Sequence, residues 1–154
     1  VNRCRAIRED RDREQRVLVV DDESAIRLLC RVNLDSAGFE TIEAGDGETA
    51  LALARSERPD LILLDVMLPV LDGWDVARKL AEMPETRGIP IVFLTARTAA
   101  SDEVQAHAVG GVGYITKPFD PAELSQTVTA TIERVRRGER DQIRREWGRS
   151  SSRD

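Results

Sequence analysis

The sequence contains few of the residues that build disulfide-stapled folds or soft-metal sites. Its 154 residues include two cysteines, Cys4 and Cys30, and one histidine, His107. These counts exclude a disulfide framework, a Cys-rich zinc site and a multi-histidine metal site. No apolar run reaches the roughly 20 residues that cross a bilayer, and the charged N-terminus lacks the apolar stretch of a signal peptide. We therefore expect a cytoplasmic protein without a membrane partner, whose chemistry depends on carboxylates.

Charge is abundant and unevenly distributed. Charged residues make up 33% of the chain and hydrophobic residues 41%, with a net charge of −5. Residues 1–16 carry six arginines against four acids, and residues 138–154 carry five arginines against four acids. The segment between them is therefore strongly acidic. An acidic body argues against direct nucleic-acid binding and suits a divalent cation.

Short apolar runs alternate with segments of helical period along the chain. The runs contain many Val, Ile and Leu residues with little in/out alternation, which is typical of strands in a sheet covered on both faces. We expect strands at 17–20, 41–44, 61–64, 91–94 and 113–116. We expect helices at 24–37, 47–56, 73–83, 98–109 and 121–136. Cys30 lies on the apolar stripe of the first helix and is predicted to be a core residue.

This alternation predicts an α/β fold, a doubly wound five-stranded parallel sheet. The predicted domain covers 17–137, between a charged N-terminal arm at 1–16 and a charged C-terminal extension at 138–154. One domain is also what a chain of this length supports. Ligands of such sheets bind outside the carboxyl ends of the strands, near the point where the strand order reverses. Residues just after each strand are therefore the candidates for chemistry.

Three acids occupy such positions. Asp21 and Asp22 follow the first predicted strand, and Asp65 follows the third. One common strand order of doubly wound sheets is 2-1-3-4-5, as in flavodoxin-like domains. If this chain has that order, the first and third strands are neighbours. Clustered carboxylates repel one another and need a cation, and Mg²⁺ fits a site without imidazole or thiolate. The alternative is that each acid is a helix cap or turn former, with Asp22 or Ser24 capping the first helix.

Thr95 follows the fourth predicted strand and Lys117 follows the fifth. An ammonium aimed at an acidic pocket either neutralises one aspartate or binds the oxygens of a phosphoryl group. Phosphoryl transfer needs little beyond positioning and charge stabilisation. Asp65 is the candidate nucleophile, because carboxylates form aspartyl phosphates.

Four motifs carry a family resemblance. The runs VLVVDDES, LILLDVMLPVLDGWD, LTAR and GYITKPF resemble, in order and spacing, the receiver domain of bacterial two-component response regulators. The resemblance covers about 17–137. It implies that Asp65 accepts a phosphoryl group from the phosphohistidine of a histidine kinase or phosphotransfer protein. The protein would then assist its own phosphorylation and dephosphorylation without being an enzyme in the usual sense.

The resemblance also implies the roles of the other site residues. Asp22 would bind Mg²⁺ directly and Asp21 mainly through water, with Asp65 and the backbone carbonyl of Met67 as further ligands. The phosphoryl oxygens would be bound by Thr95, the amide of Ala96 and Lys117, with a cis bond before Pro118 presenting the lysine. Tyr114 would be the switch residue. Tyr114 would swing inward when Thr95 is drawn to the phosphoryl group. The responding surface would comprise the fourth helix, fifth strand and fifth helix, and would bind a downstream protein or a second copy of the chain.

Two features depart from the receivers of winged-helix regulators. Val112 and Gly113 stand where that branch has a pair of acids, which argues against its salt-bridged dimer. Residues 138–154 are too few for a folded DNA-binding unit, so we expect a stand-alone receiver, with a receiver belonging to a longer transcriptional regulator as the alternative. Ile143 and Trp147, four residues apart, favour packing of this extension on the body or on a partner, and the alternative is a solvated tail.

Two other function classes fit the sequence less well. A phosphatase of the haloacid dehalogenase type needs an acid two residues after its nucleophile, where this chain has Met67. A flavodoxin-type nucleotide binder needs a Gly, Ser and Thr-rich loop after the first strand, where acids would repel phosphate. Met67 and Arg97 flank the expected approach of a hydrolytic water, and neither is a good base, so we expect an aspartyl phosphate that lasts minutes or more. Trp74 is expected to pack, Gly73 to form a turn, and His107 to lie on the surface.

Overall fold

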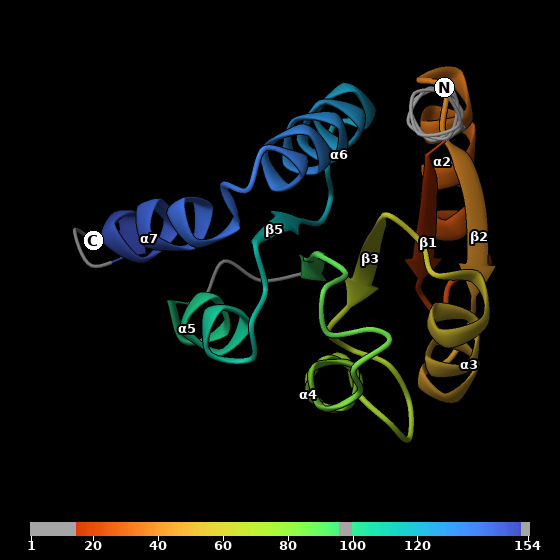
Figure 1. Ribbon diagram of the computed structural model, residues 1–154. Helices are drawn as coiled ribbons and strands as arrows, with labels where there is room; N and C mark the ends of the chain where they lie inside the picture. The colour runs from red at the N-terminus through yellow and green to blue at the C-terminus, as the bar shows by residue number, and fades with distance from the viewer. Residues whose placement is uncertain (1–14, 96–99, 152–154) are drawn as a thin grey trace, which may run out of the picture.

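The computed structural model describes residues 15–95 and 100–151, except for the side chains of 100–103 and 147–151. Strands and helices alternate as the sequence predicts. The elements are β1 (Arg16–Val20), α2 (Ser24–Ser36), β2 (Glu40–Ala44), α3 (Gly47–Glu57), β3 (Leu61–Asp65), α4 (Gly73–Glu82), β4 (Ile91–Thr95), α5 (Ala100–Ala108), β5 (Gly113–Thr116), α6 (Pro121–Arg136) and α7 (Arg140–Ser151). All strand pairs are parallel, and their order, β2-β1-β3-β4-β5, confirms the expected fold (Figure 1).

The sheet separates two hydrophobic cores. On one face α2 and α6 pack through Cys30, Leu34 and Val128 against alternate residues of β1, β3 and β4. On the other face α3 and α4 cover the remaining strand residues through small side chains such as Ala50 and Ala54. Every residue of β3 and β4 is buried, because helices cover both faces of these central strands. Cys30 is fully buried, which confirms its predicted place in the core.

Strand β1 begins one residue earlier than the sequence suggests. The predicted strand starts at Val17 and leaves Arg16 in the N-terminal arm, yet Arg16 pairs with Glu40 in the parallel register of β1 and β2. Its guanidinium forms ion pairs with Glu57 and Glu40, and its backbone N–H donates to the Asp60 carboxylate at 2.8 Å. These partners explain how a charged residue is accommodated in a strand.

The C-terminal extension forms a helix that packs on the domain. Helix α7 contacts both α5 and α6, and Ile143 lies against the core on the α2 and α6 side. The alternative of a solvated tail is therefore wrong for the described part of the extension. His107 is also not a free surface residue, because it is half-buried beneath α7. Within 15–95 and 100–151 no helix is both long and apolar enough to cross a membrane.

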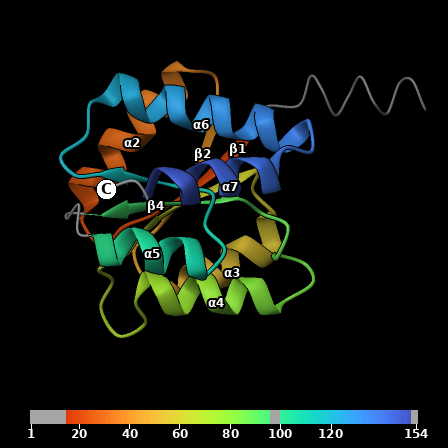
Figure 2. The same cartoon turned by 90° about the vertical axis from the view of Figure 1, so that its left-hand side faces the viewer.

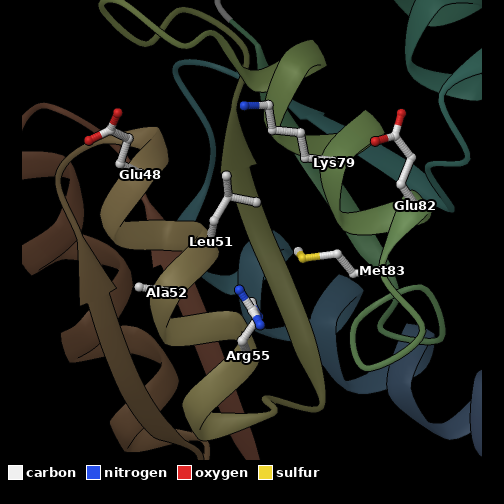
Figure 3. Close-up of a pocket in the computed structure, with 7 residues that line it drawn as sticks. All are labelled: Glu48, Leu51, Ala52, Arg55, Lys79, Glu82 and Met83. Atoms are coloured by element: carbon white, nitrogen blue, oxygen red, sulfur yellow. The ribbon is translucent and has the colours of Figure 1, made fainter.

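An open groove of about 470 Å³ lies between α3 and α4. Figure 3 shows its lining, which comprises Glu48, Leu51, Ala52, Arg55, Lys79, Glu82 and Met83. The walls mix both signs of charge around an apolar floor. No residue of the predicted phosphoryl site lines this groove, so it takes no part in the chemistry derived below.

Val70 in the loop between β3 and α4 is strained. Its φ of 67° places a β-branched residue in the left-handed region, and its side chain is fully exposed. Strain of this kind costs about 1–3 kcal/mol, whereas glycine adopts the conformation freely and loses about 0.5–1 kcal/mol through the entropy of the unfolded chain. We therefore expect Val70→Gly to raise the free energy of unfolding by about 1 kcal/mol in urea titrations. Val70→Ala, which keeps Cβ, should gain less, and an equal gain from both variants would contradict strain at this position.

Candidate functional site

The ends of two neighbouring strands bring three carboxylates together. Asp65 is the last residue of β3, and Asp21 directly follows β1, whose Val20 is in register with Leu64. The backbone N–H of Asp21 donates to the Ala44 carbonyl at 3.1 Å, which continues the sheet pattern to the site. One carboxylate oxygen from each of Asp21, Asp22 and Asp65 lies within 4.8 Å of the others. The predicted cluster is therefore present.

Lys117 reaches this cluster from the end of β5. Its Nζ donates to Asp21 Oδ2 at 2.6 Å and lies 3.4 Å from Asp65 Oδ2. The Lys117 backbone N–H donates to the Thr95 carbonyl at 2.6 Å, and the bond from Lys117 to Pro118 is cis, as the motif predicts. The lysine ammonium therefore stands between two carboxylates, close enough to move from one to the other.

Burial makes the electrostatics of this pocket unusual. Asp21 is fully buried and Asp65 is only 4% exposed. Burial, together with the nearby Asp21 carboxylate, raises the pKa of Asp65. Burial acts to lower the pKa of Lys117, but the Asp21 and Asp65 carboxylates outweigh it and raise that pKa. Three carboxylates and one ammonium leave two unbalanced negative charges, so the donor set fits one hard, oxygen-seeking divalent cation.

Backbone groups fix the orientation of the two buried carboxylates. Asp21 Oδ1 accepts the N–H of Glu23 at 2.9 Å, and Asp65 Oδ1 accepts the N–H of Met67 at 3.1 Å. Each aspartate thus also forms a local turn, so its turn-forming role and its chemical role coexist. The expectation that Asp22 or Ser24 caps the first helix is wrong, because the N-cap of α2 is Glu23, without a side-chain cap.

Two supporting roles escaped the sequence reasoning. A Cβ on Gly73 would lie 2.4 Å from the carbonyl oxygen of Asp65, so glycine is needed for close packing of α4 on β3. Arg27 Nη1 donates to the Asp21 carbonyl at 2.7 Å, and its Nε lies 3.5 Å from Glu43. The sequence indicated this role of Arg27 only through its position on the first helix, six residues after Asp21.

The other predicted site residues surround the cluster or lie outside the described part of the chain. Thr95 is buried at the end of β4, and Tyr114 on β5 is half-buried beside the core on the α3 and α4 side. Met67 is 68% exposed and lines an open pocket with Asp22. Trp74 packs against Phe93 with ring centroids 4.9 Å apart, which confirms its packing role. Ala96 and Arg97 lie outside the described residues.

The raised pKa of Asp65 predicts how its neutralisation affects stability. In metal-free buffer at pH 7, Asp65→Asn should raise the free energy of unfolding by about 1 kcal/mol, because it removes the cost of burying a charged carboxylate and the repulsion from Asp21. This advantage should shrink as the pH falls through the folded-state pKa of Asp65 and vanish below the ordinary pKa of an aspartate, where both states bind the proton.

Addition of Mg²⁺ should stabilise the wild-type chain more than Asp65→Asn. The control is Glu133→Gln, which neutralises an exposed acid near the C-terminal end of α6 and should respond to Mg²⁺ as the wild type does. Thermal or urea unfolding measures both effects. An Asp65→Asn protein that is less stable without metal, or that gains as much from Mg²⁺, would contradict these electrostatics.

Comparison with solved structures supports the same fold. The chemotaxis protein CheY4 of Vibrio cholerae superimposes with a TM-score of 0.74 and 35% sequence identity, covering 77% of this chain and 98% of that one. The receiver domain of the sensor histidine kinase PA1611 of Pseudomonas aeruginosa PAO1 gives a TM-score of 0.73 and 32% identity, over 79% and 99% of the two chains. That structure holds a magnesium ion coordinated in its active-site cleft.

Curated relatives are regulators about twice as long. The alkaline phosphatase synthesis transcriptional regulatory protein PhoP of Bacillus subtilis is 44% identical over 120 residues, which cover 78% of this chain and 49% of PhoP. The DNA-binding response regulator MtrA of Mycolicibacterium paratuberculosis is 45% identical over 120 residues, 78% of this chain and 52% of MtrA. The chain spans about half the length of these relatives. The response regulator receiver domain matches residues 17–129, and the chain accordingly belongs to the receiver domain family of two-component response regulators.

Proposed function

We propose that Asp65 accepts a phosphoryl group from the phosphohistidine of a histidine kinase or phosphotransfer protein. The observation that carries this proposal is the Lys117 ammonium placed between Asp21 and Asp65 at the carboxyl end of the sheet. The same contact supports a phosphoacceptor role, because it places the ammonium within reach of oxygens that would be bound to Asp65. A nearby Met67, which cannot donate a proton, disfavours a haloacid dehalogenase mechanism.

The chain's own residues account for the transfer step. An Asp65 carboxylate oxygen attacks phosphorus, forming the P–O bond as the P–N bond to the donor imidazole breaks, and the imidazole keeps the bonding electrons. Lys117 then turns from Asp21 toward the new phosphoryl oxygens, a short movement because its Nζ is already 3.4 Å from Asp65. The Thr95 hydroxyl and the Ala96 amide are proposed to bind the other oxygens. Charge stabilisation at fixed positions supplies most of the rate in such reactions.

We also propose that the cation of this site is Mg²⁺. Asp22, Asp65 and the Met67 carbonyl would hold it directly. Asp21 would act through water, which fits its two oxygens being already engaged by Lys117 and by the Glu23 N–H. When bound, Mg²⁺ supplies the positive charge that lets a dianionic phosphoryl group approach a pocket of carboxylates.

Phosphorylation would be read on the face formed by α5, β5 and α6. Tyr114 stands in register with Phe93 on β4, two residues before Thr95, so a shift of Thr95 toward Asp65 opens space beside β5. We propose that Tyr114 moves into this space and that the altered face binds a downstream protein or a second copy of the chain. The protein would work in the cytoplasm, without binding nucleic acid through this domain.

Acetyl phosphate tests the phosphoacceptor directly. Incubation with acetyl phosphate and Mg²⁺ should add the mass of one phosphoryl group to the wild-type chain and none to Asp65→Asn. Lys117→Ala should be modified at least about tenfold more slowly, in the range for loss of one charge-stabilising donor. Intact-protein mass spectrometry measures both, and Glu133→Gln serves as the matched acid control. Modification that persists in Asp65→Asn would show that another residue is the acceptor.

The lifetime of the aspartyl phosphate is a separate prediction. Met67 is bulky and apolar beside the acceptor, and it offers no base to activate water, so the phosphorylated protein should lose its phosphoryl group over minutes or longer in Mg²⁺. Met67→Ala should shorten this time, because it opens the approach of water. Decay followed by mass spectrometry after removal of acetyl phosphate gives the rate, and loss within seconds would refute the prediction.

A further inference from the structure

Helix α7 lies over the face that the proposed function assigns to signalling. Figure 2 shows α7 between α5 and α6, on the β5 side of the sheet, and it contacts both helices. A protein that docks on α5, β5 and α6 therefore meets α7 first. In this structure the face is covered by α7, a segment of the same chain.

The contacts that hold α7 are few and mostly polar. Arg144 Nη2 donates to the His107 carbonyl at 2.6 Å, and His107 Nε2 donates to the Arg144 carbonyl at 2.9 Å. Near the start of α7, Arg140 Nη1 donates to the Gly88 carbonyl at 3.0 Å. Arg134 on α6 pairs with Glu146 at 3.0 Å. Among the described side chains of α7, Ile143 is the apolar one, and it packs on the core.

The docked position of α7 is finely balanced. Within the described residues, the buried Nε of Arg144 has no hydrogen-bond partner, which weakens the docked state. Arg140 and Arg144 carry like charges at close range, and burial together with Arg144 lowers the pKa of Arg140. A 12-residue helix with one described apolar anchor is not stable alone in water, so its helical structure depends on these contacts. Loss of the contacts with α5 would therefore also weaken the helix itself.

Helix α5 connects the phosphoryl site to α7. It begins at Ala100, five residues after Thr95, and its last turn carries His107, the residue that holds Arg144. The turn after α5 is bonded back to it through Gly111 N–H and the Ala106 carbonyl at 2.9 Å, directly before β5. Within the described residues, α5 is therefore tied to the start of β5 at its C-terminal end and to α7 through His107.

We propose that α7 is an intramolecular cover of the α5, β5 and α6 face, released when Asp65 is phosphorylated. The proposal rests on the phosphoacceptor function and adds its regulation. The cover keeps the face closed to partners in the unphosphorylated chain. Because coupling between two sites is reciprocal, any change that weakens the docking of α7 also favours the phosphorylated state.

Amide hydrogen exchange on the full chain tests this cover, with beryllofluoride and Mg²⁺ as the stable phosphoryl mimic. The mimic should speed exchange in α7 by about fivefold or more, while β3 and β4 stay protected. Arg144→Ala should release α7 without the mimic and lower the half-saturating beryllofluoride concentration by a similar factor. Arg140→Ala, which loses the Gly88 contact, should shift both quantities in the same direction. Arg145→Ala removes the same charge from an exposed neighbour and should behave as the wild type.

The outcomes distinguish a failure of the α7 proposal from a failure of the phosphoacceptor proposal on which it rests. Exchange in α7 that is unchanged by bound beryllofluoride overturns the cover and leaves the phosphoacceptor intact. So does an Arg144→Ala protein with released α7 and unchanged affinity for the mimic. A wild-type chain that binds no beryllofluoride and is not modified by acetyl phosphate overturns both proposals. Protection of β3 and β4 in each variant shows that the domain is folded.

Discussion

A lysine ammonium held between two buried carboxylates is the interaction on which this site depends. Lys117 contacts Asp21 at 2.6 Å and lies 3.4 Å from Asp65, yet it cannot balance the charge of three clustered acids. Burial and the repulsion from Asp21 together raise the pKa of Asp65. One divalent cation would balance this excess of negative charge, and the proposed function gives the cluster that use.

The fold generates this cluster through strand order. Placing β1 beside β3 brings Asp21 to Asp65, and placing β4 and β5 next in the sheet brings Thr95 and Lys117 to the same edge. The repulsion is opposed by two cores that bury the central strands completely. Gly73 lets α4 pack directly against the Asp65 carbonyl, and Arg27 ties the Asp21 carbonyl to Glu43 on β2. The scaffold is therefore closely packed and hydrogen-bonded where charges of the same sign meet.

The strands and helices were predictable from the sequence, because each is indicated by a pattern of apolar and polar residues within a short stretch of chain. The acids were predictable as strand-end residues, although their proximity required a strand order that was taken from related folds. The start of β1 at Arg16 was not predictable, because its partners Glu40 and Glu57 are distant in sequence. The docking of α7 was also hard to predict. It depends on hydrogen bonds to the backbone carbonyls of His107 and Gly88, and every residue has such a carbonyl, so the sequence does not show which ones are used.

The most direct test of the central claim is where a divalent cation binds. Crystals grown with Mn²⁺, a Mg²⁺ substitute with a strong anomalous signal, should show one anomalous peak within coordination distance of Asp22 and Asp65, with the Lys117 ammonium on the opposite side of the Asp65 carboxylate. A peak elsewhere on the chain, or an acidic pocket that stays without one at saturating Mn²⁺, would contradict the account.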